Sequence, residues 1–75
     1  MGVSEARFRQ GDVFIDYAFE EVLFRFSYGS SRFLRKFYGE STETEIPHDN
    51  GLLNEAIRFG VETDASTYQL GKSKS

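Results

Sequence analysis

The sequence predicts a small α+β fold in which an antiparallel sheet carries a helix on one face. Two observations favour this fold. Residues 12–38 contain three runs of β-branched and aromatic side chains, which lose χ1 freedom in a helix and pack well on a pleated surface. Residues 49–60 instead place apolar side chains at helical spacing between capping residues. We therefore predict a meander of three to four antiparallel strands, one C-terminal helix packed on a face, and a short helical turn after it.

The strands are expected in the first two thirds of the chain. Residues 13–18, 22–27 and 32–38 are the three apolar runs, and the Tyr-Gly-Ser-Ser segment at 28–31 predicts a hairpin loop between the last two. Residues 41–46 alternate between acidic residues and threonine or serine, which indicates that strand structure continues beyond a bulge. The expected meander follows directly from this order.

A helical interpretation of the same region stays open. Two sets of apolar side chains also follow helical spacing: Ile15, Ala18, Phe19, Val22, Leu23 and Phe26, and then Phe33, Leu34, Phe37 and Tyr38. The alternative fold is therefore all-α, with three to four short helices. The abundance of Phe, Tyr, Val and Ile favours the sheet.

The main helix has clear ends. Pro47 disfavours helix for the residue before it, so the helix begins after that position. Asp49 or Asn50 can cap its first turn, the apolar side chains continue to about Phe59, and Gly60 falls at the position where many helices stop.

The chain is expected to form one domain, 1–75, with an ordered body of about 8–70. Asp64 can cap a short helical turn over residues 65–70. The first dozen residues are polar and predict fraying or a weak edge strand, and the small polar residues 71–75 predict a disordered tail.

Composition limits the classes of site. The chain has no cysteine and one histidine, which excludes disulfides and thiolate zinc sites, and a multi-histidine metal site would need a second chain. No run approaches the ~18 apolar residues of a membrane span. We expect a cytoplasmic protein with no membrane partner.

Three features resemble catalytic or ligand sites but lack the necessary pattern. His48 neighbours Asp49, yet no serine or cysteine sits in a nucleophile motif. The acidic residues Glu40, Glu43, Glu45 and Asp49 lack calcium-loop spacing, and the glycines form no phosphate loop. We predict that the protein is not an enzyme and holds no cofactor or metal.

Charge is distributed unevenly along the chain. Residues 22–39 contain four cations and no acid, whereas both flanking segments are acidic. The cations Arg25, Arg32, Arg35 and Lys36 alternate with aromatic residues, and this basic strip resembles the surfaces that bind single strands by phosphate contacts and base stacking. Single-stranded nucleic-acid binding through residues 25–38 is the alternative function.

The leading hypothesis concerns the second face of the sheet. A single helix covers one face only, so the other face would leave large apolar side chains exposed: Phe14, Leu23, Leu34 and Tyr38. We therefore predict a protein-interaction or regulatory module that docks on another protein or forms a homodimer, with the basic strip facing an acidic segment of the partner. A tighter roll, closed over this face by the N- and C-terminal segments, stays open as a structural alternative.

Overall fold

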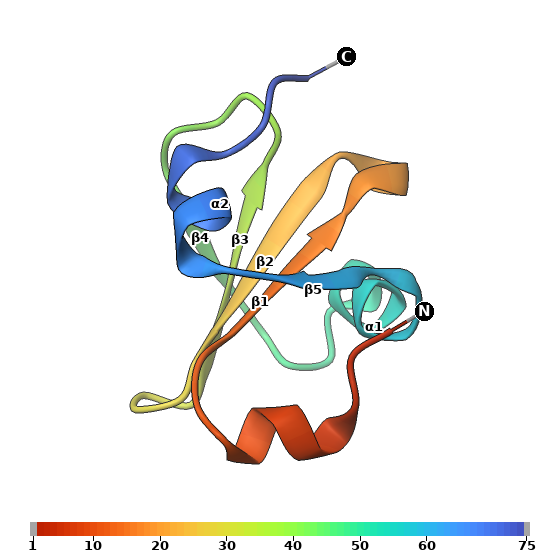
Figure 1. Ribbon diagram of the computed structural model, residues 1–75, viewed down its shortest axis with the longest axis vertical. Helices are drawn as coiled ribbons and strands as arrows, with labels where there is room; N and C mark the ends of the chain where they lie inside the picture. The colour runs from red at the N-terminus through yellow and green to blue at the C-terminus, as the bar shows by residue number, and fades with distance from the viewer. Residues whose placement is uncertain (1, 75) are drawn as a thin grey trace.

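A computed structural model describes residues 2–74 and confirms the α+β class. Five strands form one antiparallel sheet in the order β4-β3-β2-β1-β5, with α1 and α2 on opposite faces (Figure 1). The strands are β1 (Val13–Tyr17), β2 (Val22–Ser27), β3 (Arg32–Phe37), β4 (Thr44–Ile46) and β5 (Val61–Thr63). The helices are the 3-10 helices η1 (Glu5–Arg9) and η2 (Ala18–Glu20) and the α-helices α1 (Gly51–Phe59) and α2 (Ala65–Leu70). The predicted meander is β1 to β4, and β5 adds a fifth strand beside β1.

The central strands form because their side chains alternate between two apolar faces. Val13, Ile15 and Tyr17 of β1 are buried on the α1 side, and β2 is buried on both sides at its start. The register pairs Ile15 with Phe24 and Asp16 with Leu23. The two side chains of each pair therefore lie on the same face of the sheet. The loop at residues 28–31 joins β2 to β3 as predicted. A helix would have exposed part of this apolar set, and the all-α alternative does not form.

The main helix begins and ends as predicted. Asn50, rather than Asp49, caps α1, since its side chain accepts a hydrogen bond from Leu53 N at 3.0 Å. Gly60 ends the helix with extended backbone, so its role is close packing: a Cβ there would lie 2.6 Å from Ala56 O and 2.8 Å from Ile15 Cγ2. The helix end therefore packs directly against β1.

The second face of the sheet is covered by α2. The Asp64 side chain caps α2 by accepting a hydrogen bond from Thr67 N at 2.8 Å, and Gly71 ends it with a φ of 70°. Tyr68 points into the sheet and packs with Leu23 and Tyr38 in a second core cluster. The expectation of an exposed second face is therefore wrong for Leu23 and Tyr38. The C-terminal segment closes this face, as in the roll alternative, but the N-terminal segment packs on the α1 side instead.

The N-terminal segment also differs from the prediction. It forms η1 rather than an edge strand, and Val3 is buried beside α1, with its backbone N–H donating to Ile57 O at 2.8 Å. Lys72 in the predicted tail accepts a hydrogen bond from Gly39 N at 2.8 Å. Ser75 lies outside the described residues. None of the helices within residues 2–74 has the length and apolar character to cross a membrane.

Candidate functional site

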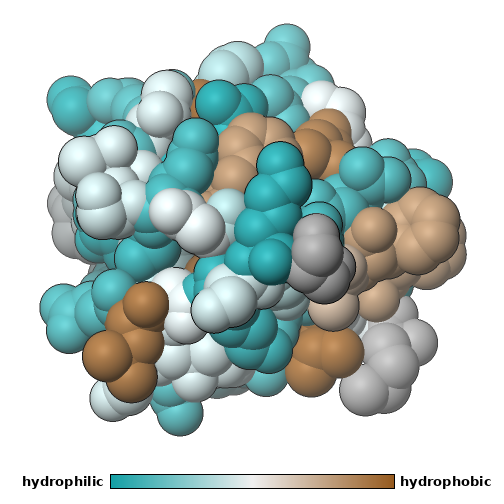
Figure 2. Space-filling view, turned by 90° about the horizontal axis from the view of Figure 1, so that it is seen from above, coloured by the Kyte–Doolittle hydropathy of each residue, from teal (hydrophilic) through white to brown (hydrophobic). Residues whose placement is uncertain are grey.

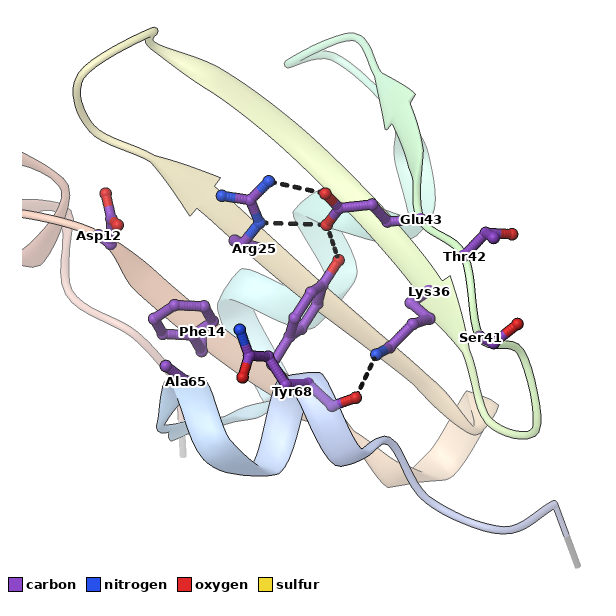
Figure 3. Close-up of a pocket in the computed structure, with 10 residues that line it drawn as sticks. Asp12, Phe14, Arg25, Lys36, Ser41, Thr42, Glu43, Ala65 and Tyr68 are labelled. Carbon is purple, nitrogen blue, oxygen red and sulfur yellow. Dashed lines mark hydrogen bonds and ion pairs between the residues drawn. The ribbon is translucent and has the colours of Figure 1, made fainter.

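An open groove lies between α2 and the sheet and has a volume of about 820 Å³ (Figure 3). Its walls come from β1, β2, β3, the segment before β4, and α2. The lining residues are Asp12, Phe14, Arg25, Lys36, Ser41, Thr42, Glu43, Ala65, Tyr68 and Gln69. The groove thus contains two cations and two carboxylates on a partly aromatic floor.

Three of these side chains form one hydrogen-bonded network. Glu43 accepts hydrogen bonds from Arg25 Nη2 at 2.7 Å and Nε at 3.1 Å, and from the Tyr68 hydroxyl at 2.7 Å (Figure 3). The bond from Arg25 lowers the pKa of the Glu43 carboxyl, and burial with the neighbouring carboxylate raises the pKa of Tyr68. The network therefore fixes an ionised Glu43 and a neutral Tyr68.

Lys36 is the one charged residue among residues 2–74 that is almost fully buried, at 5 % exposure. Its ammonium donates a hydrogen bond to Gln69 O at 3.1 Å and lies 4.8 Å from the centre of the Tyr68 ring. The carbonyl and the ring together compensate for part of the lost hydration. Lys36 therefore holds the end of α2 against β3.

The predicted basic strip is largely neutralised within the chain. Arg25 pairs with Glu43, and Arg32 pairs with Glu45 at 3.3 Å, because β3 and β4 bring the basic and acidic segments side by side. Arg35 lies 4.9 Å from the centre of the Phe37 ring, on the other face from Lys36. The four cations do not form one open strip, which removes the observation behind the nucleic-acid alternative.

Three of the predicted interface residues, Phe14, Leu23 and Tyr38, pack with Tyr68 of α2, and Leu34 lies on the same face of the sheet. Leu23 and Tyr38 are buried, and Phe14 and Leu34 are half-buried. The Tyr38 hydroxyl donates a hydrogen bond to Asp16, and burial raises the pKa of that hydroxyl. At least Leu23 and Tyr38 serve the chain's own core in this structure.

The exposed large apolar side chains lie elsewhere. Phe19 is 81 % exposed, Phe59 61 % and Val61 47 %, and we call these three the edge patch because they lie where β1 ends and β5 begins. Leu70, at the end of α2, is 87 % exposed. In the view of Figure 2, hydrophobic residues occur as separate groups within a largely hydrophilic surface. From the sequence, Phe19 and Phe59 were expected only on the apolar faces of helices. Their exposure could not be predicted without knowing that β5 pairs with β1.

Metal-ligand clusters and His48 are the remaining candidate sites within residues 2–74. These residues contain no group of three or more His, Cys, Asp or Glu side chains placed to hold a metal ion. His48 is exposed beside Asp49 in the turn before α1, with no nucleophile in hydrogen-bonded contact. The fixed network and the edge patch are instead features of a recognition surface.

Comparisons with known proteins agree with this description. The family model described as Tis1 immunity protein matches residues 1–72. A protein described as immune protein Tis1, from Pseudomonas aeruginosa strain UCBPP-PA14, is 40% identical over 68 residues, which cover 89% of this chain and 88% of the relative. A chain in the crystal structure of the complex between the type VI effector Tas1 and its immunity protein superimposes with a TM-score of 0.93 and 35% identity, covering 99% of this chain and 100% of that chain.

Proposed function

Because this chain belongs to the Tis1 immunity protein family, we propose that it binds a type VI effector related to Tas1 and thereby neutralises it. The observation that carries the proposal is the likeness to the Tas1 complex, which extends over the whole fold rather than over one motif. Membership of this family agrees with the prediction of a protein-interaction module that is not an enzyme.

The fold supports a mechanism of rigid, stoichiometric binding. Long-range side-chain bonds tie the two helices to the sheet: Tyr17 to Glu55 at 2.8 Å on the α1 side, and Tyr68 to Glu43 at 2.7 Å on the α2 side. A surface fixed in this way loses little conformational entropy on docking. A preorganised surface of this kind favours tight binding of the effector.

Self-association, a nucleic-acid partner and a cytoplasmic location were all predicted from the sequence. The cytoplasmic location stays part of the proposal. Self-association is not part of the proposal, since α2 covers the face that suggested it. Nucleic-acid binding and a broader regulatory role are not carried further.

The proposal is tested by producing a Tas1-like effector, taken from the genome that encodes this chain, in a bacterial host under an inducible promoter. Growth should stop when the effector is made alone and continue when this chain is made with it. A host that stops growing even though immunoblotting shows soluble chain in excess of the effector would contradict the proposal.

A further inference from the structure

The edge patch exposes more aromatic surface than the fold needs. Phe19 and Phe59 are 81 % and 61 % exposed, although burying such a ring is worth about 1.5–3 kcal/mol. Exposed aromatic residues gathered in one place are typical of the centre of a protein interface.

Side-chain contacts link the two rings into one surface. The Tyr17 ring lies 6.2 Å from the Phe19 ring, and the Tyr17 hydroxyl donates a hydrogen bond to Glu55 Oε1 at 2.8 Å. Glu55 and Phe59 are four residues apart on α1, so they lie on the same side of that helix. The surface therefore runs from η2 over Tyr17 to the last turn of α1.

Strand pairing adds Val61 to the same edge. Asp16 of β1 pairs with Val61 of β5, and this antiparallel register, continued past the strand ends, leads Phe59 towards the turn that carries Phe19. The close approach of Gly60 to Asp16 agrees with that register. Because Val61 pairs with Asp16, its side chain faces the α2 side of the sheet, so it lies at the same edge as the two rings but on the other face.

The turn that carries Phe19 is held in an unfavourable backbone conformation. Glu21 follows η2 with a φ of 51°, in the left-handed region that costs a non-glycine residue about 1 kcal/mol. Two backbone hydrogen bonds hold it there, from Glu21 N to Ala18 O at 3.1 Å and from Tyr38 N to Glu21 O at 2.8 Å. Strained backbone of this kind clusters at functional sites such as ligand clamps.

The border of the edge patch is acidic. Glu20 and Glu55 are exposed, and neither forms an ion pair with another residue in the range 2–74. Arg58 is the guanidinium next to Phe59 on α1. A complementary surface is therefore apolar at its centre and basic at its border.

A second copy of this chain supplies no such basic border. Five of the nine lysines and arginines are already engaged: four form ion pairs with this chain's own carboxylates, and Lys36 is buried. The other four are spread over η1, β3, α1 and the C-terminal segment: Arg9, Arg35, Arg58 and Lys74. The complementary surface thus belongs to a different protein.

We propose that the edge patch docks on the effector, with Phe19 and Phe59 entering an apolar pocket bordered by lysine or arginine side chains. This inference rests on the proposed function and specifies which surface performs it. The groove on the α2 side is then not the primary contact.

The test measures the affinity of single variants for the purified Tas1-like effector by isothermal titration calorimetry. Phe19→Ser and Phe59→Ser should each weaken binding by about 30-fold or more, the level of an interface hot spot. Leu70→Ser is the matched control, since Leu70 is at least as exposed but lies on α2, and it should change the affinity less than about threefold. Circular dichroism spectra should be unchanged for all three variants, because each side chain is largely solvated.

A second pair of variants tests the acidic border. Glu20→Lys should slow association by about tenfold at low salt, whereas Glu5→Lys on η1, with the same change of net charge, should not. Gln69→Arg probes the groove and should leave the affinity within about threefold.

The outcomes separate the two proposals. An unmodified chain that does not bind the effector contradicts the proposed function itself. Tight binding that survives Phe19→Ser and Phe59→Ser overturns the edge patch alone, and a loss confined to Gln69→Arg would move the docking surface to the groove.

Discussion

The Tyr68 hydroxyl donates a hydrogen bond to Glu43 Oε1 across 2.7 Å, and this bond joins α2 to the segment just before β4. Both elements are short and peripheral, and neither would be stable without contacts to the rest of the fold. Glu43 is held in turn by Arg25 on the central strand β2. The short helix α2 therefore covers the second core cluster, and the sheet is buried on both faces.

Two substitutions of Tyr68 separate the contribution of packing by α2 to stability from the contribution of the hydrogen bond. Tyr68→Phe should lower the free energy of unfolding by about 1 kcal/mol, since it loses one hydrogen bond. Tyr68→Ala should lower it by about 3–5 kcal/mol, because the cavity would open beside Leu23 and Tyr38. Urea unfolding followed by circular dichroism measures both, and equal effects of the two variants would show that α2 contributes little packing.

The ion pair between Arg25 and Glu43 predicts a dependence of stability on pH. The pKa of Glu43 in the folded chain is below its usual 4.5, so the unfolded chain binds the proton more tightly. The contribution of this carboxylate to the free energy of unfolding is therefore complete above about pH 5. It disappears as the pH falls through the pKa of Glu43 in the folded chain. Glu43→Gln should be less stable than the unmodified chain at pH 7, and the difference should shrink towards pH 3.

Glu45→Gln is the control for this measurement, since Glu45 pairs with Arg32 at 3.3 Å in an exposed position. Exposed pairs contribute little, so this variant should differ only slightly in stability from the unmodified chain. Urea unfolding at a series of pH values from 7 to 3 gives both curves. A Glu43→Gln difference that stays constant over the series would contradict the assignment.

Gly60 tests how closely α1 packs on the sheet. A methyl group at this position meets backbone and side-chain atoms at 2.6 and 2.8 Å, so Gly60→Ala should lower the free energy of unfolding by about 1–3 kcal/mol. Gly51→Ala, at the start of α1 with no atom within 4 Å of the added Cβ, should be neutral or slightly stabilising. Thermal unfolding of the two variants checks the difference, and equal midpoints would refute it.

The oligomeric state of the chain alone follows from the covered second face. Native mass spectrometry should give a monomer of 8.6 kDa, because α2 occupies the surface that would otherwise favour a homodimer. A species of twice that mass at micromolar concentration would instead support the self-association predicted from the sequence.

Much of the fold was predictable because the signals were local. β-branched and aromatic runs indicated β1, β2 and β3, and capping residues indicated α1 and α2. β5 was missed because three residues with one apolar side chain are too few to show an alternating hydrophobic pattern. The strand forms only because β1 offers an unpaired edge. η1 was missed for a similar reason, as the burial of Val3 depends on α1.

The candidate site was less predictable because it depends on pairing between distant segments. The sequence showed a basic segment and an acidic one, but only the β3–β4 pairing places Arg25 and Arg32 beside Glu43 and Glu45. The second face appeared free because α2 was expected to be a minor turn. The actual exposed patch arises from Phe19 and Phe59, which are 40 positions apart and are linked through Tyr17 and Glu55.

Binding to the effector is the central claim, and calorimetric titration of the purified Tas1-like effector with this chain tests it most directly. We predict saturable binding of one chain per effector, with a dissociation constant in the nanomolar range or below, as expected for a well-packed, preorganised interface. Titration at protein concentrations of tens of micromolar that shows no heat of binding, at two temperatures, would contradict the account.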